Sequence, residues 1–243
     1  MSNTPEWPSE DRINVIGQNG NDGEHYQLMG NTKMLTVNRK DFMNALKAVI
    51  VTAGKNDVRY YMNTVLLEVQ REKVTLVSTD GHRITFATLT LNTGIEESQV
   101  DLVLERADVE RLIKGVPTSK KVETEELVIK WEGESVSVEA DGTLFTFNKV
   151  DCKYPDWRRV TQDGVNLNPD RGGLTEYGIN LIYLADAEKA FKHLFIKNKY
   201  GTHKALLEFQ TANEKLWITP REIESCGQLT EIKMAIMPMR LDG

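Results

Sequence analysis

The chain has 243 residues, of which 40% are apolar and 27% are charged, and its formal net charge is −6. That length suits one large domain or two modest ones with a buried core. The sequence contains no run of about 18 apolar residues, which excludes a membrane-spanning helix. A net acidic charge, taken as a total, also argues against nucleic-acid binding.

The first 33 residues are rich in Asn, Gly, Asp, Glu and Pro, and they include the turn-forming string GQNGNDGEH. We expect residues 1–33 to form a flexible N-terminal leader with one short strand at INVIG. The leader has no basic region followed by an apolar one, so the sequence predicts no secretory signal.

From Met34 onward, one type of segment recurs three times. The three copies align without gaps and are VNRKDFMNALKAV (37–49), LERADVERLIKGV (104–116) and IYLADAEKAFKHL (182–194). Each copy leaves an apolar strand end, passes a polar turn and then shows apolar residues at the spacing of one helix face. The pattern predicts an amphipathic helix in each copy and indicates an internal duplication.

An aspartate occupies the same column of all three copies. It lies at or near the predicted helix start, where a carboxylate can satisfy free backbone N–H groups and interact favourably with the helix dipole. The three residues are Asp41, Asp108 and Asp186.

Strand-like stretches follow each predicted helix. They are rich in β-branched and aromatic residues, alternate roughly in polarity and are joined by short polar turns such as EGES and ADGT. The repeating unit is therefore β-α-β-β-β. We predict an α+β protein in which the helices lie on one face of a curved antiparallel sheet.

Positive charge is concentrated in the three helical segments. Residues 39–55, 105–121 and 186–204 carry net charges of +3, +2 and +3, so the rest of the chain carries −14. A shared helix face would be basic and would attract the backbone of double-stranded DNA with little base specificity. The alternative is that solvated helix faces simply collect lysines. The predicted DNA contacts are Arg39, Lys40, Lys47, Arg106, Arg111, Lys114, Lys189, Lys192 and Lys197.

The sequence shows no pattern of catalytic or metal-binding residues. It has no Gly-rich phosphate loop and no nucleophile elbow, and its two cysteines, Cys152 and Cys226, have no metal-ligand spacing. We therefore predict no cofactor, no metal and no enzymatic activity. The cysteines are expected to be reduced thiols in a cytoplasmic protein.

Three stretches carry a family resemblance: DVRYYMNTVLLEVQREKVTLVSTDGHRI (57–84), KYPDWRRV (153–160) and MPMRL (237–241). They closely resemble the bacterial DNA polymerase III β subunit, the sliding clamp. By this resemblance residues 34–150 form a clamp domain like the family's middle domain, residues 151–176 form a linker, and residues 177–243 form a shortened domain like half of the last one. The family's first domain has no counterpart, which suggests a reduced clamp encoded by a phage or plasmid.

The resemblance implies a non-enzymatic ring that encircles duplex DNA, tethers a polymerase to it and has helices lining its hole. It also implies a pocket that binds short hydrophobic peptides of polymerases and clamp loaders. In that pocket Gly81 would permit a tight turn, and Met237 and Met239 would supply adaptable apolar walls. Carried over residue by residue, the pocket consists of Arg59, Thr79, Gly81, His82, Arg83, Pro155, Arg159, Val160, Met237, Pro238, Met239 and Arg240.

Three functions stay open on the sequence alone. The first is a sliding clamp and processivity factor that closes as a homotrimer or homotetramer. The second is a decoy or adaptor that binds clamp-binding peptides of the host replication machinery without forming a ring, and it could be a monomer. The third, an enzyme that uses Asp80 and His82, has the least support because no nucleophile lies nearby.

Structural alternatives apply to the pocket residues as well. His82 could be a turn histidine without a binding role. Met237 and Met239 could fill an ordinary core, since terminal strands often pack in that way.

Overall fold

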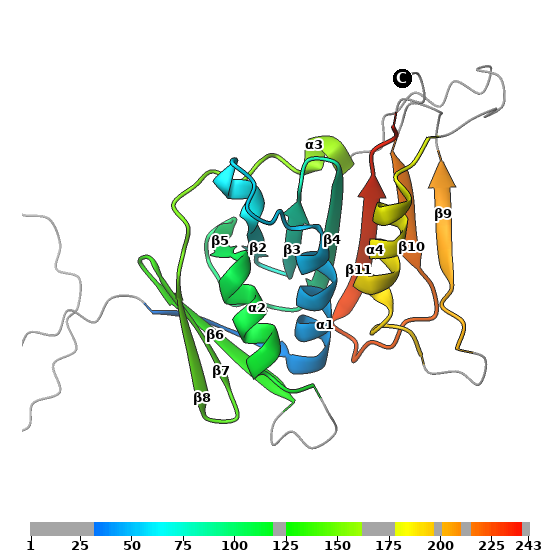
Figure 1. Ribbon diagram of the computed structural model, residues 1–243. Coiled ribbons are helices and arrows are strands. Elements are labelled where there is room, and N and C mark those ends of the chain that lie inside the picture. The colour runs from blue at the N-terminus through cyan, green and yellow to red at the C-terminus, as the bar shows by residue number, and fades with distance from the viewer. Residues whose placement is uncertain (1–31, 119–124, 162–177, 197–200, 210–214, 240–243) are drawn as a thin grey trace, which may run out of the picture. The chain divides into compact units, whose positions relative to one another are not determined.

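The computed structural model describes residues 32–118, 125–161, 178–196, 201–209 and 215–239 (Figure 1). Almost all of the expected leader lies outside the described residues. So do the expected linker from residue 162 onward and two expected contact residues, Lys197 and Arg240. None of the helices that the structure describes has the length and apolar character needed to cross a membrane.

The first two predicted repeats are complete β-α-β-β-β units. The first consists of β1 (Lys33–Asn38), α1 (Arg39–Val49), β2 (Thr64–Gln70), β3 (Lys73–Thr79) and β4 (Arg83–Thr90). The second consists of β5 (Val100–Glu105), α2 (Arg106–Gly115), β6 (Glu126–Glu132), β7 (Ser135–Ala140) and β8 (Thr143–Asn148). Two short 3-10 helices link α1 to β2, η1 (Ile50–Thr52) and η2 (Tyr60–Asn63).

The third repeat also forms, but it starts differently. It consists of α4 (Leu181–Phe191), β9 (Ala205–Phe209), β10 (Leu216–Pro220) and β11 (Leu229–Ile236). Ahead of α4 the described residues hold an isolated bridge between Gly178 and Met239 in place of an opening strand. A single helical turn, α3 (Arg158–Thr161), precedes this unit. The predicted α+β class is confirmed, and the β-α-β-β-β unit is complete in the first two repeats.

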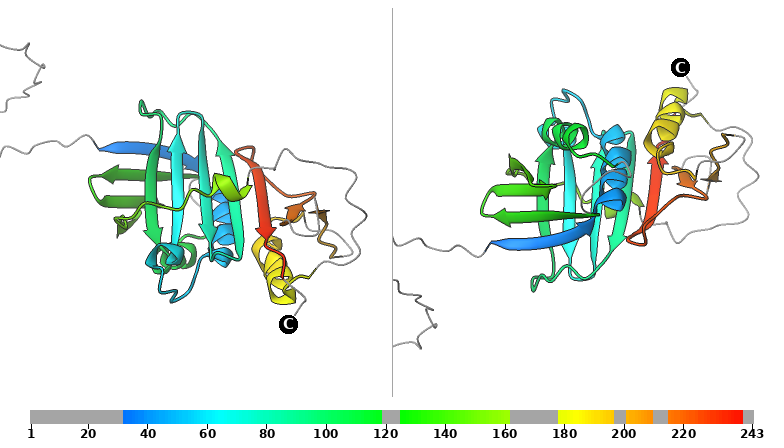
Figure 2. Two further views of the ribbon diagram at one scale, coloured as in Figure 1. Left: turned by 90° about the horizontal axis from the view of Figure 1, so that it is seen from above. Right: turned by 90° about the horizontal axis from the view of Figure 1, so that it is seen from below.

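The strands that the structure describes form two antiparallel sheets, a seven-stranded one in the order β5-β2-β3-β4-β11-β10-β9 and a four-stranded one in the order β1-β6-β7-β8. The opening strand of each of the first two units crosses to the other unit, because β1 pairs with β6 and β5 pairs with β2. The closing strands of the first and third units, β4 and β11, pair with each other and join those units in one sheet. Figures 1 and 2 show that α1, α2 and α4 lie on the same side of this sheet.

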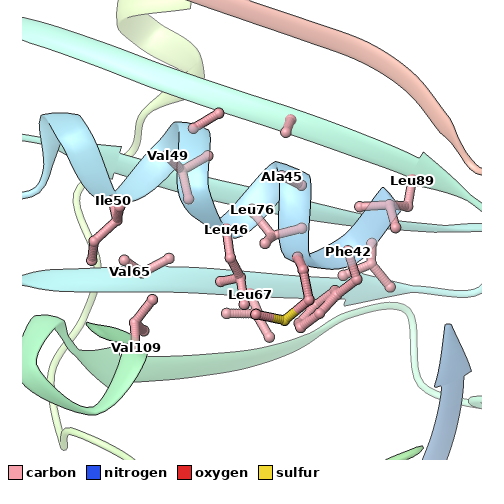
Figure 3. Packing of buried hydrophobic residues seen from close by; sticks show 14 of the residues in the cluster. Phe42, Ala45, Leu46, Val49, Ile50, Val65, Leu67, Leu76, Leu89 and Val109 are labelled. Atoms are coloured by element: carbon pink, nitrogen blue, oxygen red, sulfur yellow. The ribbon is translucent and has the colours of Figure 1, made fainter. Parts of the chain in front are cut away.

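The main core is built around α1. Its residues Phe42, Leu46 and Val49 are fully buried, and Leu67 and Leu76 of the strands pack against them (Figure 3). Nine of the eleven residues of α1 are buried, whereas α2 buries two of its ten. Burial of one large apolar side chain stabilises a fold by roughly 1.5–3 kcal/mol. The packing therefore depends on α1 more than on α2.

The aligned aspartate of the first repeat has a role that the sequence did not predict. Asn38, rather than Asp41, caps α1, and its side-chain oxygen accepts a hydrogen bond from the backbone N–H of Asp41 at 3.1 Å. The Asp41 carboxylate is fully buried and accepts backbone N–H groups of Cys226 at 2.8 Å, Gln228 at 2.9 Å and Leu229 at 3.0 Å. It thereby ties α1 to the loop that enters β11.

The other two aspartates form side-chain ion pairs, whereas the sequence predicted that they would accept backbone N–H groups at the helix start. Asp108 pairs with Arg111 at 3.0 Å within α2. Asp186 pairs with Lys189 at 2.6 Å and also with Arg83, which belongs to the first unit. The shared column thus reflects the duplication, but each copy uses its carboxylate differently.

We expect Asp41→Asn to lower the free energy of unfolding by about 2–4 kcal/mol, because the amide cannot accept all of the buried N–H donors. Urea unfolding followed by circular dichroism measures this change. Asp108→Asn is the matched control, and its cost should stay below about 1 kcal/mol because its partner is exposed. Equal costs for the two variants would contradict the assigned role of Asp41.

Candidate functional site

The string TDGHR forms the tight turn between β3 and β4. Gly81 has a φ of 88°, which a residue with a side chain adopts only with strain. The Asp80 carboxylate accepts the backbone N–H groups of His82 at 2.9 Å and Arg83 at 3.0 Å. The Thr79 hydroxyl donates to the carbonyl of Arg83 at 2.8 Å. Asp80 therefore shapes the turn and binds the backbone of His82 rather than its imidazole.

Arg83 links this turn to α4. Its Nε donates to Asp80 at 2.9 Å, a terminal nitrogen donates to Asp186, and the guanidinium carbon lies 4.5 Å from the centre of the Tyr183 ring. Burial lowers the pKa of Arg83, but the hydrogen bonds to Asp186 and Asp80 outweigh burial and raise the pKa overall. Because its side chain is only 10% exposed, Arg83 holds the site together rather than offering a free donor.

Tyr183 and Asp186 were missed by the sequence reasoning. The His82 ring stacks on Tyr183 with 6.2 Å between ring centres, and His82 itself is exposed. Asp186 belongs to the aligned aspartate column, for which the sequence predicted a role at the helix start. That prediction did not include its pairing with Arg83. No sequence signal pointed to Tyr183, because its partners are distant in the chain.

Arg59 lies against the same turn. It pairs with Asp57 at 2.8 Å and donates to the carbonyl of Asp80 at 3.2 Å. Hydrogen bonds from Arg59 lower the pKa of Asp57 to about 2. A Cβ added at Gly81 would lie 3.1 Å from a terminal nitrogen of Arg59, so the turn and this side chain fit closely.

The end of β11 reaches the turn from the third unit. The Met237 backbone N–H donates to the carbonyl of His82 at 2.8 Å, and that of Met239 donates to Gly178 at 2.9 Å. The Met237 and Met239 residues are 41% and 51% exposed, which excludes ordinary core filling. The exposed Met237 thus lies beside the exposed His82, and the exposed Met239 follows two residues later, which gives the apolar surface that a peptide-docking site requires.

Three further expected pocket residues, Pro155, Arg159 and Val160, lie on or next to α3. This turn of helix is at the same end of the seven-stranded sheet as the β3–β4 turn and the end of β11 (Figure 1). Arg159 and Val160 are exposed, and Pro155 is half-buried. The neighbouring Tyr154 attaches this segment to the sheet, with its hydroxyl 3.4 Å from the carbonyl of Val77.

A polar hollow of about 350 Å³ lies beside the turn. It is lined by Val51, Ala53, Gly54, Lys55, Asp57, Arg59, Asp80, His82, Arg83 and Arg106. Most of these side chains are charged, so this hollow differs from the apolar cleft expected beside His82. The apolar part of the site is the open surface at Met237 and Met239.

The structure overturns the assignment of Arg39 to a DNA-contacting surface. Arg39 is 1% exposed, and both of its terminal nitrogens donate to the Asp141 carboxylate. A residue buried in this way cannot reach a DNA backbone.

Two more of the predicted DNA-binding residues donate hydrogen bonds to backbone carbonyls, although Arg111 remains exposed. Arg106 donates to the carbonyls of Ile50 at 2.8 Å and Ala53 at 2.6 Å, which fixes α2 against η1. Arg111 donates to the carbonyl of Thr146 at 2.8 Å.

The predicted lysines are more accessible. Lys114 and Lys192 are exposed and form no ion pair within the described part of the chain. Lys40 pairs with Glu224 at 2.6 Å, and Lys189 is held by Asp186. Lys47 is half-buried, donates to a threonine hydroxyl at 3.0 Å and has a pKa lowered by burial.

The family model for the DNA polymerase III beta subunit, central domain, matches residues 36–156. The Beta sliding clamp of Vibrio cholerae is 31% identical over 107 residues, which cover 44% of this chain and 28% of that protein. The Beta sliding clamp of Escherichia coli K12 is 27% identical over 147 residues, which cover 60% of this chain and 36% of that protein. The chain belongs to the DNA polymerase III beta-subunit family.

Solved structures show the same fold. The DNA polymerase III subunit beta of Pseudomonas aeruginosa matches with a TM-score of 0.69 and 18% identity, covering 90% of this chain and 69% of that one. The DNA polymerase III beta subunit of Thermotoga maritima matches with a TM-score of 0.63 and 15% identity, covering 86% of this chain and 66% of that one. The predicted clamp fold is confirmed, and the chain aligns with only about a third of the length of the curated relatives.

Membership of the DNA polymerase III beta-subunit family supports the prediction that the chain is not an enzyme. The turn geometry is consistent with this, because Asp80 is occupied by backbone donors. No group of three or more His, Cys, Asp or Glu residues that could hold a metal occurs among the residues that the structure describes.

We expect Asp186→Asn to lower the free energy of unfolding by about 1–2 kcal/mol at neutral pH, because Arg83 loses a charged hydrogen-bond acceptor. Burial raises the pKa of Asp186, but bonds from Lys189 and Arg83 lower it overall. A lowered folded-state pKa means that the stabilisation is present above the unfolded pKa, near 4, and is lost as pH falls through the lower folded value.

Thermal unfolding of the wild type and of Asp186→Asn between about pH 7 and about pH 3 measures this effect, and the difference should shrink as the pH falls through the acid range. A difference that is constant across the range would contradict the ion pair. The exposed Glu188, two residues after Asp186 in α4, provides a control substitution to Gln.

Proposed function

We propose that this chain is a DNA sliding clamp and polymerase processivity factor that acts in the cytoplasm. In this role it holds or encircles duplex DNA and recruits replication proteins through a peptide site at the β3–β4 turn. The observation that carries the proposal is the match of residues 36–156 to the central domain of the DNA polymerase III beta subunit.

The helix side of the seven-stranded sheet is the proposed DNA-facing surface. α1, α2 and α4 lie together there (Figure 2), and lysines occur on or next to all three helices, exposed at Lys114 and Lys192 and half-buried at Lys40 and Lys47. Lysines on such a surface bind phosphates without reading bases and release counterions when they do so. The proposed contacts exclude the buried Arg39 and give little weight to Arg106 and Arg111. They are Lys40, Lys47, Lys114, Lys189 and Lys192, with Lys197 outside the described residues.

The proposed peptide site combines an exposed imidazole, the two exposed methionines and the residues of α3. Methionine side chains are flexible and polarisable, which suits a surface that accepts several different peptides. A short peptide on an open surface is expected to bind at micromolar strength or weaker.

Ring closure is a further part of the proposal, with a homotrimer or homotetramer as the expected state. The second candidate function is a decoy or adaptor that binds peptides without a ring. It is favoured by one observation: the turn, α4 and the end of β11 meet within a single chain, so the peptide site needs no second copy.

Light scattering behind a sizing column, over a concentration series, separates the two candidates. A trimer or tetramer would support a ring around DNA. A monomer at every concentration would favour the decoy or adaptor.

Combined replacement of Lys47, Lys114 and Lys192 by Gln should weaken binding to duplex DNA. The slope of log affinity against log salt should also flatten by about one for each phosphate that the variant no longer neutralises. Fluorescence anisotropy of a labelled duplex at several salt concentrations measures both quantities. Replacement of Lys73, Lys130 and Lys233, which lie on strands, is the charge-matched control. If both triple variants keep the wild-type slope, the helices do not face DNA.

Met237→Ala combined with Met239→Ala should weaken binding of a clamp-binding peptide from a bacterial DNA polymerase III about tenfold or more, because the shorter side chains offer the peptide less apolar surface. Fluorescence polarisation of the labelled peptide measures the affinity, and His82→Ala tests the imidazole in the same assay. Met34→Ala is a suitable control, since Met34 is 59% exposed on β1. Wild-type affinity in the methionine variants would remove these residues from the site.

A further inference from the structure

Residues 150–161 form a strap across the face of the seven-stranded sheet opposite α1. Its first backbone N–H, at Val150, donates to the carbonyl of Val103 at 2.8 Å. Tyr154 is 8% exposed, and its hydroxyl lies 3.4 Å from the carbonyl of Val77. These contacts belong to a second apolar cluster, separate from the core around α1.

The strap ends in α3, which has little stability of its own. The helix has only four residues, and none of them is buried. A single helical turn fixes too few hydrogen bonds to hold its shape without tertiary contacts. Next to it, the Trp157 ring packs on Phe86 with 5.5 Å between ring centres. That contact positions the start of α3 but leaves its rotation open.

An ion pair between a buried carboxylate and a half-buried guanidinium supplies the missing constraint. Glu68 lies on β2 and is 1% exposed, and its two carboxylate oxygens accept both terminal nitrogens of Arg158, one of them at 2.7 Å. The Arg158 guanidinium also lies 4.5 Å from the centre of the Trp157 ring. The hydrogen bond to Glu68 raises the pKa of Arg158.

The geometry of this pair favours one docked position. Two parallel hydrogen bonds fix the plane of the guanidinium as well as its distance from the carboxylate. A carboxylate left buried without its cation is strongly unfavourable, so moving α3 away from the charged Glu68 carries an energetic cost. The residues that follow Arg158 are Arg159 and Val160, which are exposed at the end of the sheet that carries the β3–β4 turn.

We propose that Glu68 and Arg158 are positioning residues of the peptide site: the ion pair of Arg158 with the buried Glu68 fixes α3 so that Arg159 and Val160 form one wall of it. This inference rests on the proposed peptide-binding function. Glu68 itself touches no peptide, and it acts only through Arg158.

The test compares peptide affinity with stability in three variants. The probe is the same labelled clamp-binding peptide of a bacterial DNA polymerase III, and melting temperature reports stability. Glu68→Gln should reduce the affinity about tenfold. Its matched control is Glu139→Gln, because Glu139 of β7 forms an exposed pair with Lys130 of β6 and its substitution should leave the affinity unchanged.

The double variant Glu68→Gln with Arg158→Gln separates positioning from stability. It carries no unpaired charge, so it should recover most of the melting temperature while its peptide affinity stays low. Recovery of affinity together with melting temperature would overturn the proposal, since the pair would then be only structural. Should Glu68→Gln fail to fold, the double variant still decides between these results.

Hydrogen exchange adds a readout that a general loss of stability would not reproduce. The amides of Val160 and Thr161 donate to the Trp157 carbonyl at 3.1 and 3.2 Å, and they should exchange faster in Glu68→Gln while β2 to β4 keep their protection. Unchanged exchange and unchanged affinity would overturn the positioning role. If the wild type binds no peptide at all, the proposed function itself fails. Binding by the wild type with equal affinity in Glu68→Gln removes only this inference.

Discussion

The pairing of β11 with β4 depends on a buried carboxylate at one end and a backbone hydrogen bond at the other. Asp41 gathers three backbone N–H groups of the loop that leads into β11. At the far end the Met237 N–H meets the carbonyl of His82. Between these points the two strands stay in register from Leu229 to Ile236, with one irregularity near the start. The candidate peptide site exists because this register brings Met237 to the turn.

Charged groups connect the units in addition to the apolar core, which runs through all three. Asp186 of the third unit meets Arg83 of the first, and Glu68 of a central strand meets Arg158 of α3. Ion pairs with fixed geometry tolerate less sliding than apolar contacts, because the charges are left without partners when they separate. In this chain such pairs stand at the borders of the candidate site. The ion pairs therefore hold α4 and α3 at defined positions beside the candidate site.

The hydrogen bonds of the arginines change which basic residues are free to contact DNA. Counting charges along the sequence treats every arginine as available, but Arg39, Arg106 and Arg111 are used to join helices to strands and loops. Arginine suits this task because its planar fork can satisfy several carbonyl or carboxylate oxygens at once. The lysines, with flexible stems and a single charged group, are left facing solvent at Lys114 and Lys192.

Apolar spacing determined the three helices and the strands that follow each of them, whereas the turn at Gly81 was expected from the family resemblance. The resemblance added most of the residues that cluster around that turn. Only the tertiary structure decided which groups meet across units, such as Asp41 with the loop before β11 and Tyr183 with His82. Those contacts join residues about 100 to 190 positions apart, and spacing along the chain carries no information about such partners. The burial of individual basic residues could not be predicted for the same reason. Arg39 and Lys114 are both basic residues of predicted helices, but only Arg39 is buried, where it pairs with Asp141.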